Sequence, residues 1–146
     1  MLFFVGLLVS SSGLAGTATG RTVRVAAVQC YSRMGAIDYN RKLLTSLIEQ
    51  ASSNGAKIVV LPECAVSGYM NPANQVIWTT NSVPEEGEMP IHKYAESIPG
   101  PSTEYFGNLS TRLGIYLCLS LAESAEGRFF NSQVLLTPEG KIVAHH

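Results

Sequence analysis

Residues 22–61 alternate between strand and helix patterns, and this order limits the chain to few folds. β-branched and apolar residues dominate 22–30 and 57–61, as they do in buried strands. Between these runs, apolar side chains fall on one helical stripe, and Asn54-Gly55 provides a stop signal. A strand, a helix and a second strand in this order predict two parallel strands joined by a right-handed crossover.

The rest of the chain continues the alternation. Asp38 is expected to cap the first helix, and Ser102 is expected to cap a second helix that ends at Gly114. Residues 67–100 contain four prolines, so only short helical pieces are expected there. Further strands are expected over residues 115–121, 129–136 and 141–144, the last two joined by a tight turn. The prediction is one α/β domain with a mixed sheet.

The first 20 residues have a different character. No charged residue occurs before Arg21, residues 2–9 are continuously apolar, and small residues follow. This pattern is typical of a secretory signal peptide, and the apolar run is too short to span a bilayer. We therefore expect residues 1–20 to be a signal peptide, residues 21–146 to form the domain, and the protein to be secreted or periplasmic. An apolar first strand is the alternative interpretation, since no basic residue precedes the apolar run.

Charge and cysteine content exclude several classes of function. The formal net charge is −1 and the pI is about 6.3, which gives no electrostatic footprint for nucleic acid. The three cysteines are odd in number and have no C-x-x-C spacing, so neither a disulfide framework nor a metal site is predicted. Cys30 and Cys118 lie in strand patterns and are expected to be small core residues. If the chain is exported, one disulfide bond is also compatible with the sequence.

Glu63 is the first candidate for chemistry. It follows Leu61-Pro62 at the end of a predicted parallel strand, where α/β sheets bind their ligands. We expect the neighbouring apolar strand to desolvate its carboxylate partly, which suits a general base. Position alone favours the alternative, a solvated acid that has no role in function, because most acidic residues at strand ends have none.

The surrounding residues resemble the nitrilase superfamily, the carbon-nitrogen hydrolases. Members of this superfamily open with an Ala-x-Val-Gln strand and carry a glutamate in a strand-Pro-Glu-x-x-x-x-Gly-Tyr segment, as residues 26–29 and 59–69 do here. Matches follow in the same order at residues 98–101, residues 114–116, Glu123, Asn131 and residues 138–143. The resemblance therefore covers everything after the N-terminal 20 residues.

The resemblance implies a fold and a mechanism. The fold is an α-β-β-α sandwich, of which this chain carries the N-terminal portion. The mechanism uses a Glu-Lys-Cys set to hydrolyse a small nitrile or amide through a thioester, without a metal or organic cofactor. Glu63 matches the general base. The matching lysine and cysteine lie beyond residue 146, so the chain is expected to be truncated and inactive alone, and the complete protein is expected to form homo-oligomers.

Three neighbouring residues have weaker assignments. Tyr69 and Glu123 are candidates for the substrate pocket, and a hydrogen-bonded supporting role is the alternative for Glu123. Cys64 adjoins Glu63, but adjacent residues leaving a strand point to opposite sides, so the two are not expected to act as base and nucleophile.

Two other functions stay open. The chain can be an inactive truncated module that binds a partner subunit through the surface that the rest of a sandwich would cover. An amide or acyl transferase of the same superfamily would use the same three residues with a different acceptor.

Overall fold

The computed structural model describes residues 22–68 and 91–146. Within these ranges the chain forms five strands, two α-helices and one 3₁₀ turn. In chain order they are β1 (Val25–Ala27), α1 (Ile37–Ser53), β2 (Ile58–Val60), η2 (Ile91–Lys93), α3 (Pro101–Leu113), β3 (Tyr116–Ala125), β4 (Arg128–Leu136) and β5 (Ile142–His145). The expected signal peptide, Tyr69 and most of the proline-containing segment lie outside the described residues.

The strands form a single mixed sheet in the order β1-β2-β3-β4-β5. β1 pairs parallel with β2 and β2 with β3, whereas β3–β4 and β4–β5 are antiparallel. The parallel βαβ unit, the mixed sheet and the final hairpin are therefore confirmed. β1 and β2 are shorter than expected because each has only three paired residues, and the flanking residues continue as loops.

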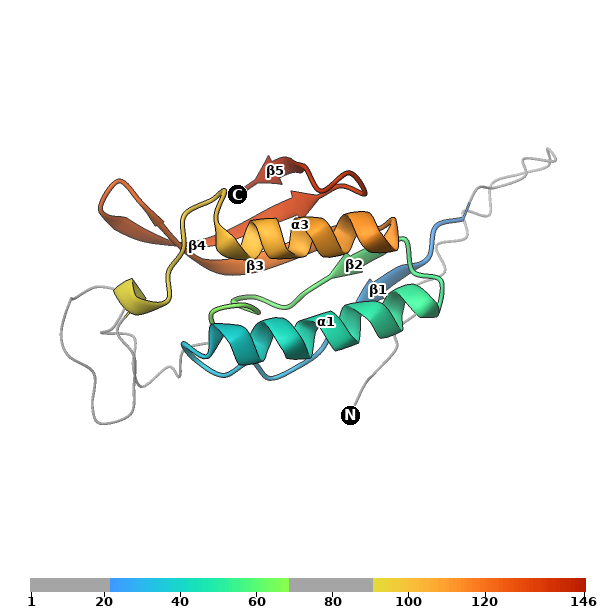
Figure 1. The fold of residues 1–146 in the computed structure, drawn as a ribbon, viewed down its shortest axis with the longest axis horizontal. Helices are drawn as coiled ribbons and strands as arrows, with labels where there is room; N and C mark the ends of the chain where they lie inside the picture. The colour runs from blue at the N-terminus through green and yellow to red at the C-terminus, as the bar shows by residue number, and fades with distance from the viewer. Residues whose placement is uncertain (1–21, 69–90) are drawn as a thin grey trace, which may run out of the picture.

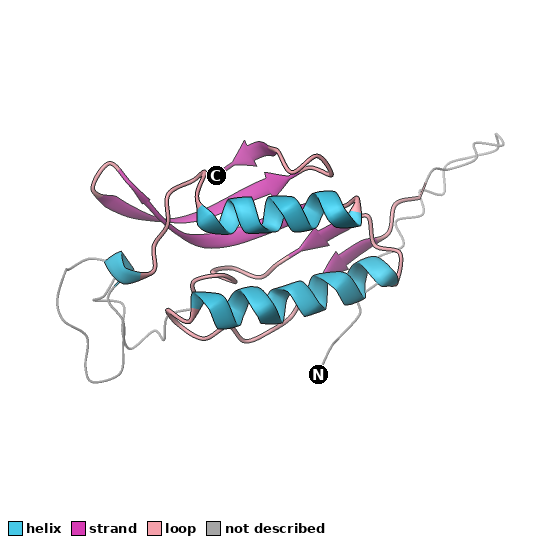
Figure 2. Cartoon of the chain, in the orientation of Figure 1, coloured by secondary structure: helices cyan, strands magenta, loops and turns pink. Residues whose placement is uncertain are grey.

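Both α-helices lie side by side on one face of the sheet (Figures 1 and 2). The core between helices and sheet is apolar and almost completely buried. Its largest members include Leu44 and Ile48 of α1, Phe106 of α3, Val59 of β2, and Leu117 and Leu136 of β3 and β4. Burying each such side chain contributes about 1.5–3 kcal/mol, so this layer provides most of the driving force for folding.

The predicted helix caps are wrong at both helix starts. α1 has Ala36 at its N-cap, and Asp38 lies in its first turn, where a negative charge is also favourable. α3 has Gly100 at its N-cap, and the Thr103 hydroxyl accepts a hydrogen bond from its N–H at 2.8 Å. Ser102 does not cap, because it is buried inside the first turn. Both predicted helix ends are confirmed, at Asn54 and Gly114.

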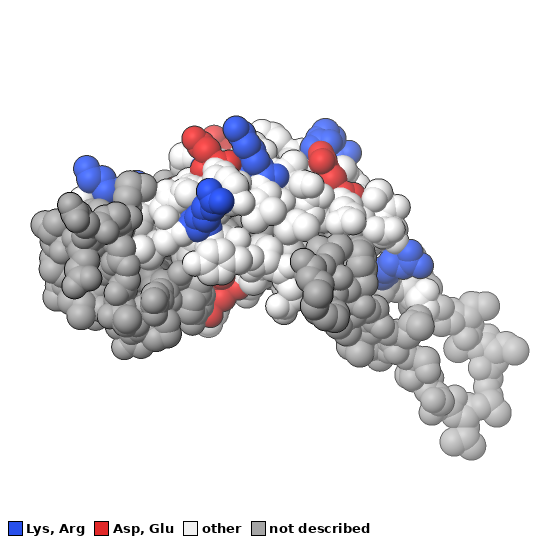
Figure 3. All heavy atoms as spheres, turned by 90° about the horizontal axis from the view of Figure 1, so that it is seen from below, with Lys and Arg blue, Asp and Glu red and all other residues white. Residues whose placement is uncertain are grey.

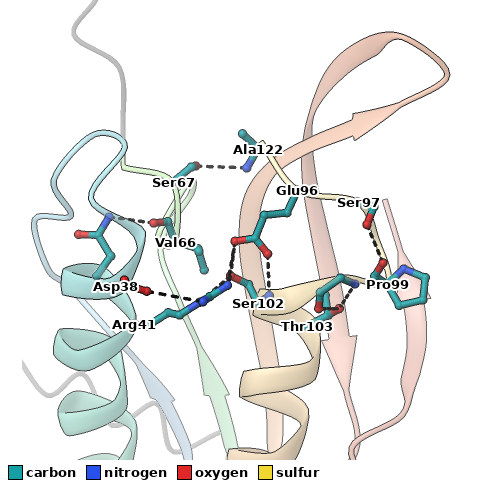
Figure 4. A network of polar contacts seen from close by, with 12 residues as sticks. Asp38, Arg41, Val66, Ser67, Glu96, Ser97, Pro99, Ser102, Thr103 and Ala122 are labelled. Atoms are coloured by element: carbon teal, nitrogen blue, oxygen red, sulfur yellow. Dashed lines mark hydrogen bonds and ion pairs between the residues drawn. The ribbon is translucent and has the colours of Figure 1, made fainter. Parts of the chain in front are cut away.

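The side chain of Glu96, in the loop before α3, caps the first turn of this helix in place of Ser102. Glu96 Oε2 accepts the Ser102 N–H at 2.6 Å, and Glu96 Oε1 accepts the Ser102 hydroxyl at 2.8 Å. Arg41 of α1 donates to Glu96 Oε1 at 2.9 Å, with 17% and 12% of the two side chains exposed (Figure 4). This network joins the two helices at one end, and its low exposure protects it from solvent screening.

The sheet face opposite the helices carries an apolar surface. Paired residues point to the same side of a sheet, so the register places one cross-strand row on this face: Ala27, Val60, Cys118, Leu135 and Ala144. A second row contains Val25, Ile58 and Tyr116. All eight residues are partly or fully exposed. We call these two rows the open face.

On the face shown in Figure 3, side chains of both signs are scattered among uncharged atoms and form no patch of one sign. Within residues 22–68 and 91–146, no helix is long and apolar enough to cross a membrane.

Replacing Glu96 with glutamine tests the link between the helices. Glu96→Gln removes the negative charge that Arg41 and the first turn of α3 share, so the free energy of unfolding should fall by about 1–3 kcal/mol. Urea denaturation measures this change. Glu104→Gln, at an exposed position in the same first turn of α3, should cost less than about 1 kcal/mol. Equal losses for the two variants would contradict the proposed role of Glu96.

The open face predicts self-association of the isolated 146-residue chain, because exposed contiguous apolar surface favours burial against another copy. Its apparent mass in analytical ultracentrifugation should therefore rise with protein concentration. Tyr116→Lys places a charge in the open face and should weaken this association. Tyr31→Lys is the matched control, since Tyr31 lies in a loop and is 81% exposed. A chain that stays monomeric at all concentrations would refute the prediction.

Candidate active site

The turn that carries Glu63 follows β2 and continues to bond along β3. The Leu61 N–H donates to the Cys118 carbonyl at 3.0 Å, and the Val66 N–H donates to the Ser120 carbonyl at 3.1 Å. In the other direction, the Ala122 N–H donates to the Ser67 hydroxyl at 3.2 Å (Figure 4). The turn is therefore held against β3, and Glu63 lies at the carboxyl end of β2, as the sequence predicted.

A buried amide from α1 holds the same turn from the other side. Asn40 is completely buried, and its Nδ2 donates to the Val66 carbonyl at 2.8 Å and to the Arg33 carbonyl at 2.7 Å. Sequence reasoning missed Asn40. The signal that could have found it is its position, four residues before Leu44 on the buried stripe of the helix, where a polar side chain needs partners.

Gly68 completes the anchoring of the turn. Its φ is +85°, and a Cβ at this position would lie 2.4 Å from the Met34 Cα. Only glycine satisfies both the left-handed backbone and this close approach. The neighbouring Ser67 carbonyl accepts the Gly35 N–H at 2.8 Å, so the turn packs directly on the loop before α1.

Glu63 is exposed, so the partial desolvation expected from the neighbouring strand is wrong. The side chain leaves the turn toward solvent and toward β4. There its Oε1 accepts a hydrogen bond from Asn131 Nδ2 at 2.5 Å. The carboxylate is thus held by a hydrogen-bond donor on β4.

Cys64 is buried in a left-handed backbone conformation, with φ of 50°. Its N–H donates to the Ser120 hydroxyl at 2.9 Å, and its thiol donates to Asn131 Oδ1 at 3.4 Å. The simple strand alternation assumed for Glu63 and Cys64 therefore does not apply, because both side chains contact the same amide. Alternation ends with β2 at Val60, before either residue.

The thiol of Cys64 is poorly suited to nucleophilic attack. Burial, followed by the negative charge of Glu63, raises the pKa of Cys64 to about 11, while a hydrogen bond to Ser67 acts in the opposite direction. The nucleophile in cysteine enzymes is the thiolate, which is a minute fraction at neutral pH for such a pKa. Cys64 is therefore a hydrogen-bond donor at this site.

Glu123 lies on the other face of the sheet from Asn131. Asn131 pairs with Ala122 in the register, so the adjacent Glu123 projects toward the helix side. It is buried, and its Oε2 accepts the Ser132 hydroxyl at 2.5 Å and contacts His145 Nε2 at 2.9 Å. These contacts favour the supporting role over a place in the substrate pocket.

The other cysteines are also free thiols. Cys30 and Cys118 are half-buried, and burial raises the pKa of both. All three cysteines lie in the described residues, and none is in a disulfide. In residues 22–68 and 91–146, no three His, Cys, Asp or Glu side chains come together as a metal-binding group. The described part of the site is a carboxylate, an amide and a protonated thiol.

Comparison with known proteins identifies the family of the chain. The family model for carbon-nitrogen hydrolases matches residues 24–146, which is most of the chain. The chain belongs to the carbon-nitrogen hydrolase family. The resemblance seen in the sequence is thereby confirmed, and with it a nitrilase-type α/β fold.

Among the relatives of this carbon-nitrogen hydrolase chain are amidases and nitrilases. Omega-amidase NIT2-B of Xenopus laevis is 37% identical over 101 residues, covering 68% of this chain and 30% of the relative. An aliphatic nitrilase of Sinorhizobium fredii is 28% identical over 125 residues, covering 84% and 40%. The relatives are enzymes, and amide or nitrile hydrolysis is their general class of activity. The chain spans about one third of the length of these relatives.

A solved structure agrees with the fold. XC1258 of Xanthomonas campestris, a CN-hydrolase superfamily protein with an arsenic adduct in its active site, is 26% identical with a TM-score of 0.64. The match covers 85% of this chain and 39% of that protein. The sheet and helices described above are therefore part of a larger nitrilase-type fold in that protein.

The pKa of Cys64 predicts how its thiol reacts. Alkylation by iodoacetamide, followed by site-resolved mass spectrometry, should quicken about tenfold per pH unit from pH 7 toward pH 10, because the thiolate fraction rises until the pKa of about 11. Glu63→Gln removes the neighbouring negative charge and should speed alkylation of Cys64 severalfold at fixed pH. Glu139→Gln, an exposed acid in the turn before β5, is the control and should change nothing. A plateau near pH 8 would contradict the assignment of Cys64 as a protonated donor.

Proposed function

We propose that this chain supplies the general base, Glu63, of an enzyme that hydrolyses a small amide or nitrile through a cysteine thioester. The observation that carries the proposal is the placement of Glu63 at the carboxyl end of β2, with Oε1 held by Asn131. Among the described residues, no hydrogen bond to Oε2 is seen, so this oxygen is available to accept a proton. Family membership supplies the expectation of the lysine and cysteine, which would come from polypeptide beyond residue 146.

In the proposed reaction, Glu63 accepts and returns one proton in each of two steps. Glu63 takes the proton of the attacking cysteine thiol as its sulfur bonds to the carbon of the amide. The lysine ammonium stabilises the negative oxygen that develops in this step. Glu63 then returns the proton to the nitrogen, ammonia leaves, and a thioester remains. Glu63 then deprotonates a water molecule that attacks the thioester carbon, the carbon–sulfur bond breaks to release the acid, and Glu63 returns the proton to the sulfur to restore the thiol.

The placement of the site relative to the open face supports this proposal. Asn131 pairs with Ala122, and Leu135 pairs with Cys118, so Asn131 points to the same side of the sheet as the open face. Polypeptide that covers the open face would therefore lie beside Glu63. The polypeptide that buries the open face would then also bring the lysine and the cysteine next to Glu63.

Amides are the proposed substrates in preference to nitriles. The omega-amidases are 32–37% identical to this chain, whereas the nitrilases are 27–28% identical. A short ω-amide of a dicarboxylic acid, such as succinamate, is therefore the first substrate to test, followed by an aliphatic nitrile and acrylamide.

The open face also supports a second function. A row of partly exposed apolar residues across all five strands suits the binding of another protein subunit. In this alternative the chain has no activity of its own or in a longer form, and Glu63 has no role in chemistry.

Ammonia release distinguishes the two functions. The protein expressed from a reading frame that extends beyond residue 146, called the extended protein, should release ammonia from one of the three substrates. In this protein, Glu63→Gln should lower kcat by about 10²–10⁴-fold because the general base is lost. The 146-residue chain alone should release none. Glu139→Gln is the control for loss of a surface carboxylate and should keep full activity. Ammonia release by the isolated chain, abolished by Glu63→Gln, would refute the need for further residues, and full activity of the extended Glu63→Gln variant would refute the role of Glu63.

A further inference from the structure

We propose that Asn131 is the positioning residue for Glu63, with its side-chain amide held in the required orientation by the Cys64 thiol. The inference rests on the proposed function, because it explains how Glu63 is presented to a substrate. It adds two residues to the site, one on β4 and one in the turn after β2, neither of which takes part in bond making.

The polarity of the amide carries the first step of the argument. A carboxylate can only accept hydrogen bonds, so the Nδ2 end of Asn131 has to face Glu63 for the contact at 2.5 Å to exist. The opposite end, Oδ1, can only accept, and it faces the Cys64 thiol at 3.4 Å. An acceptor on one side and a donor on the other give the amide one favourable orientation. Flipping it would set Oδ1 against the carboxylate.

The protonation of Cys64 makes this orientation stable. A thiol holds the oxygen end of the amide only while it keeps its proton. Because burial and the charge of Glu63 raise the pKa of Cys64 to about 11, the thiol remains a donor throughout the range in which proteins work. The properties that make Cys64 a poor nucleophile therefore make it a dependable donor.

The sheet fixes both ends of the contact. Cys64 is tied to β3 by its N–H bond to Ser120, and Asn131 is tied to β3 by its register opposite Ala122. Glu63 itself is an exposed side chain on a turn and would otherwise be free to change rotamer. The Asn131 amide, which is fixed by strands β3 and β4, therefore restricts the Glu63 side chain to one rotamer. Because the amide contacts Oε1, Oε2 is left for proton transfer.

A positioning role predicts a loss of kcat with little change in KM, since Glu63 moves protons and does not hold the substrate. In the extended protein, Asn131→Leu keeps the volume but removes both hydrogen bonds, and Asn131→Asp sets a second carboxylate against Glu63. Both should lower kcat by about tenfold to 100-fold, Asn131→Asp the more. Gln133→Leu is the matched control, because Gln133 is an exposed amide on the same strand and the same face.

Two variants of Cys64 test the orienting contact. Cys64→Ser keeps a hydrogen-bond donor for Asn131 Oδ1, so this variant should retain most of its kcat. Cys64→Ala removes the donor, so its kcat should fall toward that of Asn131→Leu. This difference would not arise if Cys64 only filled space, because alanine and serine are nearly equal in size. Loss of all activity in Cys64→Ser with the fold intact would overturn the proposal by making Cys64 the nucleophile.

A double-mutant cycle tests the contact without activity. Urea unfolding of Glu63→Ala, Asn131→Ala and the double variant in the extended protein should show a coupling of about twofold or more in the unfolding equilibrium constant. The cycle of Glu63→Ala with Gln133→Ala should show none. Absence of coupling between Glu63 and Asn131 overturns the inference.

The two readouts separate this inference from the proposed function. If the unsubstituted extended protein releases no ammonia, the proposed function fails and the positioning role fails with it, while the cycle still decides whether the contact exists. If the protein is active and the cycle shows coupling, but Asn131→Leu keeps its kcat, the inference alone is overturned.

Discussion

The hydrogen bonds between the turn after β2 and strand β3 determine where the site residues lie. β2 has only three paired residues, yet the chain continues to bond to β3 as far as Ser67. Cys64 takes part through the Ser120 hydroxyl, and its left-handed backbone turns Glu63 and Cys64 toward the same strand, β4. If this turn were a free loop, Glu63 would be one of many exposed acids. Held as it is, Glu63 has a defined place relative to the sheet.

Local patterns predicted the fold because most of its contacts follow from periodicity. The βαβ unit, the mixed sheet and the position of Glu63 after a strand all depend on residues close together in sequence. The helix caps failed for a different reason. Ser102 is a good local cap, but Glu96 satisfies its N–H through a network that also requires Arg41 of α1, 61 residues earlier. No local rule contains that partner.

The same reasoning explains which parts of the site could not be predicted. Glu63 was found from its place at the end of a strand and from the family pattern. Its contact with Asn131 joins residues 68 positions apart, and alternation gave the wrong geometry for Cys64 because β2 ends before it. Asn40 was missed although its burial could be read from the helical stripe. Glu123 and Asn131 point to opposite faces of the sheet. Predicting which of them faces Glu63 requires the register of β3 with β4, which the sequence pattern does not give.

Burial divides the carboxylates of this domain into two kinds. Glu96 and Glu123 are largely buried: Glu96 has hydrogen-bond donors on both oxygens, and Glu123 contacts the Ser132 hydroxyl and the His145 ring through Oε2, as buried polar groups require. Glu63 is exposed and has one amide on one oxygen. The contacts of Glu96 and Glu123 hold parts of the fold together, whereas Glu63 is held at Oε1 alone among the described residues, which leaves Oε2 open to a substrate or solvent proton under the proposed function. It also points to the side of the sheet that carries the open face, so polypeptide that buries this apolar surface would enclose Glu63 and supply the desolvation that the described residues do not give it. Under the proposed function, the polypeptide that covers the apolar rows would therefore also lie against the carboxylate, so burial of the open face and enclosure of Glu63 would be coupled.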